Sequence, residues 1–275
     1  MRARPVTVVA LDIGGSSVKA GQVTDGRPVG EVAVTPWAES GPADQLIGVL
    51  AAAIRGVAAG AGPVRVAAAA PDPFDHAAGV SRMTHKFAAL HGLALAPLLA
   101  GTLGRPLEIR WCNDAAAAVA GEAVAGAGAG YHRVLGVTLG TGLGVALVRG
   151  GVVVERVGEV IVGDLWSAAL ADGRSADSAF SARALLRAVD AGTAAQFGTE
   201  LGGLLAPVVA AAGVEVIVVG GGGAGSLAHI ADALTSTLAV PVERFRLGRW
   251  GALVGAVQLC WPGARQSAEV RHPDG

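Results

Sequence analysis

The sequence predicts an α/β fold divided into two lobes, and three observations support that prediction. Strand-like apolar runs alternate along the chain with stretches rich in Ala and Leu, which is the pattern of α/β proteins. The 275 residues are enough for two modest domains. A strand, a glycine-rich reversal and a second strand occur twice, about half a chain apart, as expected if each copy opens one lobe.

Local sequence patterns predict the individual elements. Strands are expected at short runs rich in Val, Ile and Thr, and helices where Ala and Leu recur behind a polar residue such as Asp114 or Ser181. The expected strands are "VTVVALD", "VGEVAVTP", "VRVAAAA", "LEIRWC", "RVLGVTLG", "GVALVRGGVVVE" and "VEVIVVGG". The expected helices span 44–59, 94–103, 114–125, 181–191, 198–212 and 227–238.

Two further stretches connect these elements. Residues 87–104 contain no Asp, Glu, Lys or Arg, but His91, Pro97 and three glycines favour a loop and a short buried helix over a membrane span. Residues 123–133, "AVAGAGAGYHR", are a candidate hinge or linker between the lobes, and a plain surface loop is the alternative.

Composition argues against several classes of function. Lys and Arg number 21 against 22 Asp and Glu, so the net charge of −1 gives no field that attracts nucleic acid or an anionic membrane. Cys112 and Cys260 have no paired spacing, which argues against a disulfide framework and a cysteine zinc site. The N-terminus reaches Asp12 too soon for a signal-peptide core. A cytoplasmic protein with a small-molecule partner is therefore expected.

The stretch "LDIGGSSVKAG" interrupts an apolar strand at Asp12 and resumes it five residues later. Paired glycines permit a tight reversal and the close approach of a ligand, and the hydroxyl and amine groups that follow are donors for phosphate oxygens. Asp12 is a candidate for holding a hydrated Mg²⁺. A polar hairpin turn without a ligand is the alternative. The candidate phosphate-binding residues are Gly14, Gly15, Ser16, Ser17 and Lys19.

The stretch "VTLGTGLG" repeats this donor-rich reversal, and a plain turn is again the alternative. Two such hairpins, each opening a lobe, are predicted to face each other across a cleft and to present backbone N–H groups to phosphates. The candidate residues of the second hairpin are Thr138, Gly140, Thr141 and Gly142.

A third glycine-rich stretch, "VIVVGGGGAG", follows a strand and precedes a helical segment, an arrangement that suits a phosphate or nucleoside edge. Its candidate ligand-binding residues are Gly221, Gly222 and Gly223. Gly220, Gly222 and Gly225 also match G-x-G-x-x-G, with Glu243 at the distance of a ribose-binding acid, so a dinucleotide site is an alternative. Only 32 residues follow Glu243, too few for the second half of a dinucleotide-binding sheet.

The strand "LEIRWC" delivers Asn113 and Asp114 to the start of an Ala-rich helix. Asp114 is a candidate general base that accepts a proton from a substrate hydroxyl, with Asn113 orienting the same substrate. The alternative for Asp114 is a helix N-cap.

Taken in order, these motifs resemble the ROK family of sugar kinases within the actin and hexokinase superfamily. "LDIGGSSVKAG" and "VTLGTGLG" are similar to its two phosphate motifs, "CNDAAAAVAGE" to its sugar-binding and catalytic motif, and "VIVVGGGGAG" to its adenosine motif. The resemblance implies two RNase H-like lobes with a cleft between them. The expected lobes are residues 1–114, joined by a C-terminal helix at 248–262, and residues 115–247.

The sequence departs from the family in two places. The E-x-G-H segment and the cysteine-rich zinc loop are absent after the second hairpin, so no zinc is expected, and Glu159 or Asp164 is a candidate for the missing sugar-binding Glu. Asp72 stands where the family commonly has glycine, at the start of the expected sugar loop. The candidate substrate contacts in that loop are Asp75, His85 and Lys86, each with a solvated loop charge as its alternative.

The resemblance therefore implies an enzyme that uses ATP and Mg²⁺ to phosphorylate a primary hydroxyl of a hexose or hexose-like cyclitol, with glucose as the default acceptor. It also implies a homodimer. The alternatives are a non-catalytic sugar-sensing regulator of the same family, or an NAD(P)-dependent oxidoreductase that uses the glycine run.

Overall fold

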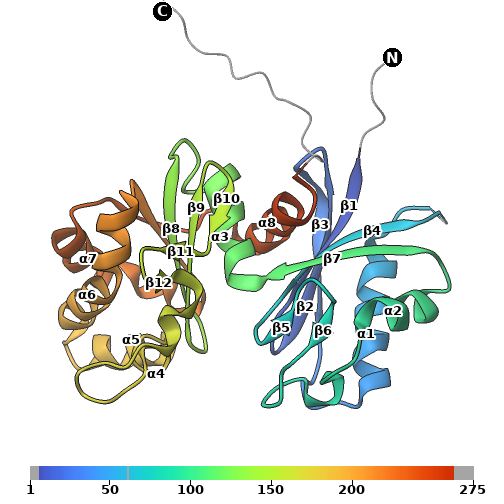
Figure 1. The fold of residues 1–275 in the computed structure, drawn as a ribbon, viewed down its shortest axis with the longest axis horizontal. Helices are drawn as coiled ribbons and strands as arrows, with labels where there is room; N and C mark the ends of the chain where they lie inside the picture. Colours follow the sequence, from blue (N-terminus) through green and yellow to red (C-terminus); the bar gives the residue numbers. More distant parts are fainter. Residues whose placement is uncertain (1–5, 61, 263–275) are drawn as a thin grey trace, which may run out of the picture. The chain divides into compact units, whose positions relative to one another are not determined.

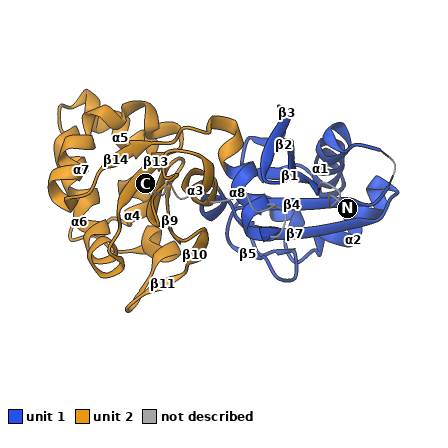
Figure 2. Ribbon diagram, turned by 90° about the horizontal axis from the view of Figure 1, so that it is seen from above, with its two compact units in different colours: residues 1–117, 252–275 blue, residues 118–251 orange. Residues whose placement is uncertain are grey.

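The computed structural model describes residues 6–60 and 62–262. The chain forms two compact units, residues 1–117 with 252–275 and residues 118–251, coloured separately in Figure 2. It passes from unit 1 to unit 2 inside helix α3 (Asp114–Ala125) and returns at the start of helix α8 (Gly251–Cys260). Among the described residues, no helix is both long and apolar enough to cross a membrane.

Unit 1 is built on a five-stranded sheet in the order β3-β2-β1-β4-β7 (Figure 1). β1, β2 and β3 form an antiparallel meander, whereas β4 and β7 run parallel to β1. The elements of this unit are β1 (Thr7–Ile13), β2 (Ser17–Thr24), β3 (Arg27–Pro36), α1 (Ala43–Val57), β4 (Val64–Ala70), β5 (Phe74–Asp75), β6 (Val80–Ser81), a 3₁₀ turn (Ala88–Leu90), α2 (Leu95–Leu103) and β7 (Leu107–Asn113).

The two faces of this sheet bury different residues. Helices α1 and α2 cover one face, where Leu50 and Leu99 are fully buried beside strand residues such as Val66. Ala67 and Ala69 alternate with Val66 and are also fully buried, on the opposite face. α8 reaches this unit through Arg110 of β7, whose Nη1 donates to the carbonyl oxygen of Cys260 at 3.0 Å.

Unit 2 repeats the same plan in the order β10-β9-β8-β13-β14. β8, β9 and β10 are antiparallel neighbours, and β13 and β14 run parallel to β8. The core lies between the sheet and the long helix α6 (Ala194–Ala212), as Leu135, Val219 and Leu201 are fully buried. The other elements are β8 (Arg133–Leu139), β9 (Leu143–Arg149), β10 (Val152–Val154), β11 (Arg156–Val157), β12 (Val160–Ile161), a 3₁₀ helix (Val162–Ser167), α4 (Ala176–Ala179), α5 (Ala182–Asp190), β13 (Val216–Gly220), a 3₁₀ helix (Gly222–His229), α7 (Ala231–Leu238), β14 (Val242–Arg244) and a 3₁₀ turn (Gly248–Trp250).

The shared strand order confirms the predicted α/β class and the predicted hairpin repeat, since β1–β2 and β8–β9 occupy equivalent places in the two sheets. Several expected elements differ in extent, among them the helix expected at 198–212, which begins at Ala194. The apolar run at 144–155 is not one strand, because Gly150 and Gly151, both at positive φ, turn the chain between β9 and β10. The helix expected at 227–238 begins only at Ala231.

The prediction that residues 123–133 link the lobes is wrong, because this stretch lies inside unit 2. It is held there by Glu122, whose fully buried carboxylate accepts hydrogen bonds from the backbone N–H groups of Ala127, Arg246 and Leu247 at 2.8 to 3.0 Å. Ala127 itself is buried. A buried carboxylate that accepts several N–H groups fixes the chain around it, which a free linker would not allow.

The two cysteines, which are far apart in the sequence, lie together in unit 1 as free thiols. The Cys112 thiol on β7 donates to the carbonyl oxygen of Ala68 at 3.8 Å, and its proximity to the Cys260 thiol at the end of α8 raises the pKa of Cys112 and lowers that of Cys260. The sequence spacing gave no sign of this contact.

Candidate active site

The tip of the first hairpin exposes backbone amide groups. Gly14 N donates to Ser17 O at 3.0 Å and closes the reversal, while Trp37 donates from its backbone and its indole to the carbonyl oxygens of Ser16 and Gly14 at 3.2 and 2.8 Å. Gly15 and Ser16 are exposed, and their amide groups have no acceptor within the described part of the chain. The tip therefore offers donors to an anion while its carbonyl groups are turned to Trp37.

Asp12 and Lys19 are paired across this hairpin. They are opposite residues in the register of β1 and β2, and Lys19 Nζ lies 2.6 Å from Asp12 Oδ2. Lys19 thus forms an ion pair with Asp12, and its role as a phosphate donor stays a prediction. Asp12 still fits the predicted Mg²⁺ role, because Mg²⁺ keeps most of its waters and needs only one or two protein carboxylates. No group of three or more His, Cys, Asp or Glu residues placed for a metal occurs in the described ranges.

The second hairpin has an equivalent tip. Gly140 N donates to Gly142 O at 2.9 Å, and the carbonyl of Gly140 accepts from Ala182 N at 2.9 Å. Thr141 is exposed, and neither its amide group nor that of Gly142 has an acceptor among the residues described. The Thr138 hydroxyl instead lies 3.4 Å from the carbonyl oxygen of Gly144, within the hairpin.

Asp177 of α4 holds this tip in place and was missed by the sequence reasoning. Its Oδ1 accepts a hydrogen bond from Leu143 N at 2.9 Å. A Cβ atom at Gly142 would lie 1.9 Å from the same oxygen, so a side chain there would displace the Asp177 carboxylate. Asp177 is 34 residues from Leu143, and no local pattern marked it.

The glycine run lies against the second hairpin. Gly221 has a φ of +83°, and a Cβ atom there would come within 2.5 Å of the carbonyl oxygen of Leu139, the last residue of β8. Gly223 also packs against this residue, since its Cβ would lie 3.0 Å from Leu139 Cβ. Unit 2 therefore brings the second hairpin and the glycine run together.

The structure of unit 2 argues against the alternative that the glycine run binds a dinucleotide. Gly222 and Gly225 lie in a 3₁₀ helix, and the α-helix starts only at Ala231. Glu243 on β14 is paired with Arg246 at 3.2 Å. The sheet also contains an antiparallel meander, unlike the mostly parallel sheet of dinucleotide-binding folds.

Asn113 and Asp114 lie at the C-terminal edge of the parallel strands, where Asn113 is the register partner of Ala70 at the end of β4. Asn113 Oδ1 accepts from Ala116 N at 2.9 Å, which is the hydrogen bond of a helix N-cap. The N-cap alternative for Asp114 is therefore wrong, since the cap is Asn113. Asp114 Oδ1 instead accepts from the amide of the next residue, Ala115, at 2.8 Å.

The surroundings of Asp114 suit a general base. Burial raises the pKa of its carboxyl group, and the negative charges of Asp12 and Asp72 raise it further. The Ala115 N–H group and the charge of Lys86 act in the opposite direction. A carboxylate with a raised pKa is a stronger proton acceptor, and its ionised form is disfavoured by the fold.

The predicted substrate residues are not all gathered at this edge. Lys86 is near enough to influence Asp114, and Asp72 contacts Asn113 directly, with Oδ2 2.7 Å from Asn113 Nδ2. Asp75 is bound to its own loop, because it accepts from Ala78 N at 3.0 Å and lies 3.6 Å from Arg82, which together lower its pKa.

His85 and Glu159 both have exposed side chains. His85 lies in the loop that follows β6. Glu159 is exposed in the turn between β11 and β12 of unit 2, as is Asp164 a few residues later.

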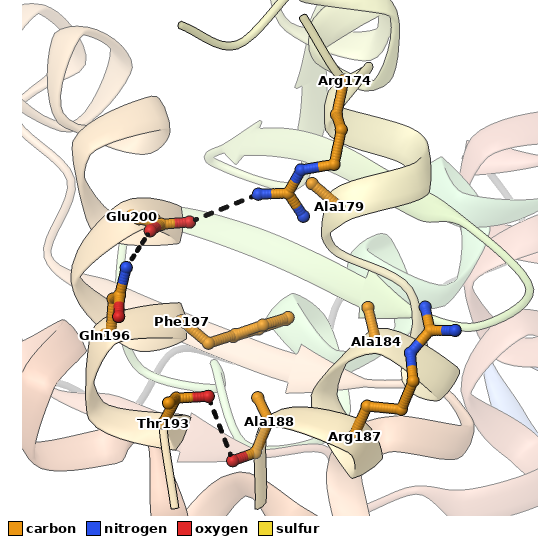
Figure 3. Close-up of a pocket in the computed structure, with 9 residues that line it drawn as sticks. All are labelled: Arg174, Ala179, Ala184, Arg187, Ala188, Thr193, Gln196, Phe197 and Glu200. Carbon is orange, nitrogen blue, oxygen red and sulfur yellow. Dashed lines mark hydrogen bonds and ion pairs between the residues drawn. The ribbon is translucent and has the colours of Figure 1, made fainter. Parts of the chain in front are cut away.

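A cavity of about 280 Å³ lies elsewhere in unit 2 and contains none of the predicted residues. Figure 3 shows Phe197 in its middle, with Arg174 reaching Glu200 at 3.8 Å. The lining residues are Arg174, Ala179, Ala184, Arg187, Ala188, Thr193, Gln196, Phe197 and Glu200.

Known proteins that are similar to this chain include members of the family that its sequence motifs resemble. The model of the ROK family matches residues 8–160. A glucokinase from Thermotoga maritima is 32% identical over 145 residues, which are 52% of this chain and 45% of that protein, so the chain spans less than half the length of this curated relative.

Two solved structures are similar over nearly their whole length. An inorganic polyphosphate/ATP-glucomannokinase from Arthrobacter sp. strain KM has a TM-score of 0.70 and 27% identity, covering 91% of this chain and 96% of its own. A ROK hexokinase from Thermus thermophilus has a TM-score of 0.69 and 26% identity, covering 95% and 100%. These likenesses confirm the predicted fold of two RNase H-like lobes.

Proposed function

The chain belongs to the ROK family, and from that premise we propose that it is a kinase that transfers the γ-phosphoryl group of ATP to a primary hydroxyl of a hexose or hexose-like cyclitol. Glucose is the acceptor we expect first, in keeping with the glucokinase and glucomannokinase relatives. The proposal rests on Asp114. Its carboxyl group has a raised pKa and does not cap the helix that follows, because Asn113 provides that cap.

In this reaction the acceptor hydroxyl oxygen forms a bond to the γ-phosphorus while the bond to the β-phosphate oxygen breaks and ADP leaves. Asp114 accepts the hydroxyl proton, which makes the oxygen a better nucleophile. Its raised pKa increases its affinity for that proton, and the Ala115 N–H group fixes the direction of its carboxylate.

Asn113 and the hairpin tips bind the two substrates. One N–H of the Asn113 amide is held by Asp72, and the other is left to donate to an acceptor oxygen. The amide groups of Thr141 and Gly142, which have no acceptor among the described residues, bind phosphate oxygens of the nucleotide, beside the glycine run that receives the adenosine.

Asp12 would hold Mg²⁺ through water, as argued above from its single carboxylate. When bound, the ion neutralises charge on the phosphate oxygens. Lys19 keeps the Asp12 carboxylate in a fixed position by its contact at 2.6 Å.

The experiment is a screen of hexoses and cyclitols with the purified chain, MgATP or inorganic polyphosphate as donor, and mass spectrometry of the acceptor. We expect ADP release to depend on the acceptor and the acceptor to gain one phosphoryl group. An acceptor-free reaction measures background hydrolysis, and a parallel titration with NAD(P) tests the oxidoreductase alternative. Nucleotide-independent sugar binding without phosphoryl transfer would favour the sugar-sensing regulator and contradict the proposal.

A further inference from the structure

Asp72 joins two strand ends at the edge where Asn113 and Asp114 lie. It follows β4 by two residues, while Asn113 is the last residue of β7, and the two strands are parallel neighbours. Asn113 Nδ2 donates to Asp72 Oδ2 at 2.7 Å, and Phe74 N donates to Asp72 Oδ1 at 3.2 Å. The C-terminal edge of parallel strands is where ligands bind in α/β sheets. Asp72 is therefore placed to contact whatever Asn113 contacts.

These contacts fix the orientation of the Asn113 amide. Its Oδ1 is committed to Ala116 N at 2.9 Å and one Nδ2 hydrogen to Asp72, so a flip of the amide would break both hydrogen bonds. One N–H of Asn113 remains to donate. The surroundings thus present a donor of known direction, not a freely rotating amide.

The Asp72 carboxylate has acceptor capacity left over. A carboxylate has about four lone-pair positions, of which Asn113 and Phe74 occupy two, and the Asp72 side chain is 54% exposed. The nearest cationic candidate is His76, whose Nε2 is 3.9 Å from Asp72 Oδ1. The remaining donor of Asn113 and the remaining acceptors of Asp72 therefore lie side by side.

An alcohol is the group that satisfies both at once, because a hydroxyl oxygen accepts one hydrogen bond and donates another. We propose that Asp72 is a specificity-determining residue of the acceptor site, which together with Asn113 binds one ring hydroxyl of the acceptor, other than the hydroxyl that is phosphorylated. Asn113 donates to the oxygen of that hydroxyl and Asp72 accepts its hydrogen. This inference rests on the proposed kinase function, and it deepens it by requiring a polyhydroxylated ring with a free hydroxyl at that position.

The test compares the parent with Asp72→Ala and Asp72→Asn, using glucose and its 1-, 2-, 3- and 4-deoxy analogues. We expect Asp72→Ala to raise the acceptor KM about 10- to 100-fold, the loss typical of a hydrogen bond to a charged group, while kcat and the KM for ATP change little. Asp72→Asn keeps an acceptor oxygen and restores part of the affinity. Glu108→Gln, an exposed carboxylate at the far end of β7, is the matched control.

The deoxy series gives a second readout that a merely structural role would not change. The parent should discriminate against one analogue in particular, and Asp72→Ala should lose that discrimination while keeping the others. Equal discrimination in parent and variant, or a loss of kcat with an unchanged acceptor KM, would overturn the proposal. Melting temperatures of all variants show whether the loop has stayed folded.

Direct binding of glucose by calorimetry separates this proposal from the kinase function. A parent that binds glucose but transfers no phosphoryl group would refute the proposed function, and the role of Asp72 would still be decided by the affinities of the variants. A parent that binds no sugar of the series would overturn the role of Asp72 as well.

Discussion

The second hairpin offers a test in which two neighbouring glycines respond differently. A Cβ atom at Gly140 would have its nearest contact 4.0 Å away, at the carbonyl oxygen of Gly142, and Gly140 is not at positive φ. Gly140→Val is therefore compatible with the fold, and its free energy of unfolding should stay within about 1 kcal/mol of the parent value.

We expect the same side chain to cover the amide groups of Thr141 and Gly142, neither of which has an acceptor among the described residues. Hydrogen bonds to a charged group contribute about 1.5 to 3 kcal/mol each. Loss of one such bond weakens binding about 10- to 100-fold, because 1.4 kcal/mol corresponds to a factor of ten. We expect Gly140→Val to weaken MgATP binding by that factor and to leave sugar binding unchanged.

Gly142→Ala is the contrasting variant. Its Cβ would lie 1.9 Å from Asp177 Oδ1, and the clash would displace the carboxylate that accepts from Leu143 N. Overpacking of this kind costs about 1 to 3 kcal/mol, so this variant should melt at a lower temperature, unlike Gly140→Val.

Calorimetric titration with MgATP and thermal unfolding are measured for both variants beside the parent. If Gly140→Val binds MgATP as the parent does, the second hairpin does not contact the nucleotide, and the phosphate role inferred from its exposed amides is refuted. A parental melting temperature for Gly142→Ala would contradict the role given to Asp177.

Three further predictions concern stability, pH and metal. Glu122→Gln should lower the free energy of unfolding by about 1 to 3 kcal/mol in urea titrations, because an amide cannot accept at both former carboxylate oxygens; an unchanged midpoint would contradict this. Because burial and the charges of Asp12 and Asp72 raise the pKa of Asp114, turnover should fall as pH drops through a value above the ordinary pKa of an aspartate side chain. Asp72→Asn removes one of these charges, so the pH at which turnover falls should be lower in this variant than in the parent. An unchanged pH profile would show that the charge of Asp72 does not affect the pKa of Asp114. Activity should survive strong zinc chelation once Mg²⁺ is resupplied, and stoichiometric zinc with loss of fold on chelation would refute this.

Most of the fold could be predicted from local sequence patterns. The two hairpins, the strand that ends at Asn113 and the helix over Asp114–Ala125 could be predicted because each depends on short-range periodicity and turn residues. The linker prediction failed at residues 123–133 because glycine-rich composition does not reveal the tertiary contact made by Glu122. The break between β9 and β10 was missed because two glycines at positive φ were read as part of one strand.

The candidate site was also predictable only where its features depend on local sequence. The exposed amides at the hairpin tips follow from glycine placement, and the sequence reasoning found them. Contacts of individual side chains could not be predicted in this way. The structure was needed to find the Asp12–Lys19 ion pair, the helix cap at Asn113 and the hydrogen bond by which Asp177 supports the second hairpin. Asp72 was noticed as an unusual residue, but its contact with Asn113 joins positions 41 residues apart.

The central claim is that Asp114 is the base of a phosphoryl transfer, and Asp114→Asn tests it most directly. The variant keeps an oxygen that can accept from Ala115 N and leaves the cap at Asn113 untouched. Its melting temperature at neutral pH should equal or exceed that of the parent. The raised pKa means that the parent loses stability relative to the variant as pH rises through the pKa of folded Asp114.

The measurement is steady-state phosphorylation of the acceptor by Asp114→Asn, with MgATP affinity and melting temperature recorded on the same protein and Glu108→Gln as the control. We predict that turnover falls about 10²- to 10⁴-fold while MgATP affinity remains at the parental level. A variant that melts like the parent, binds MgATP and turns over at a near-parental rate would contradict the account.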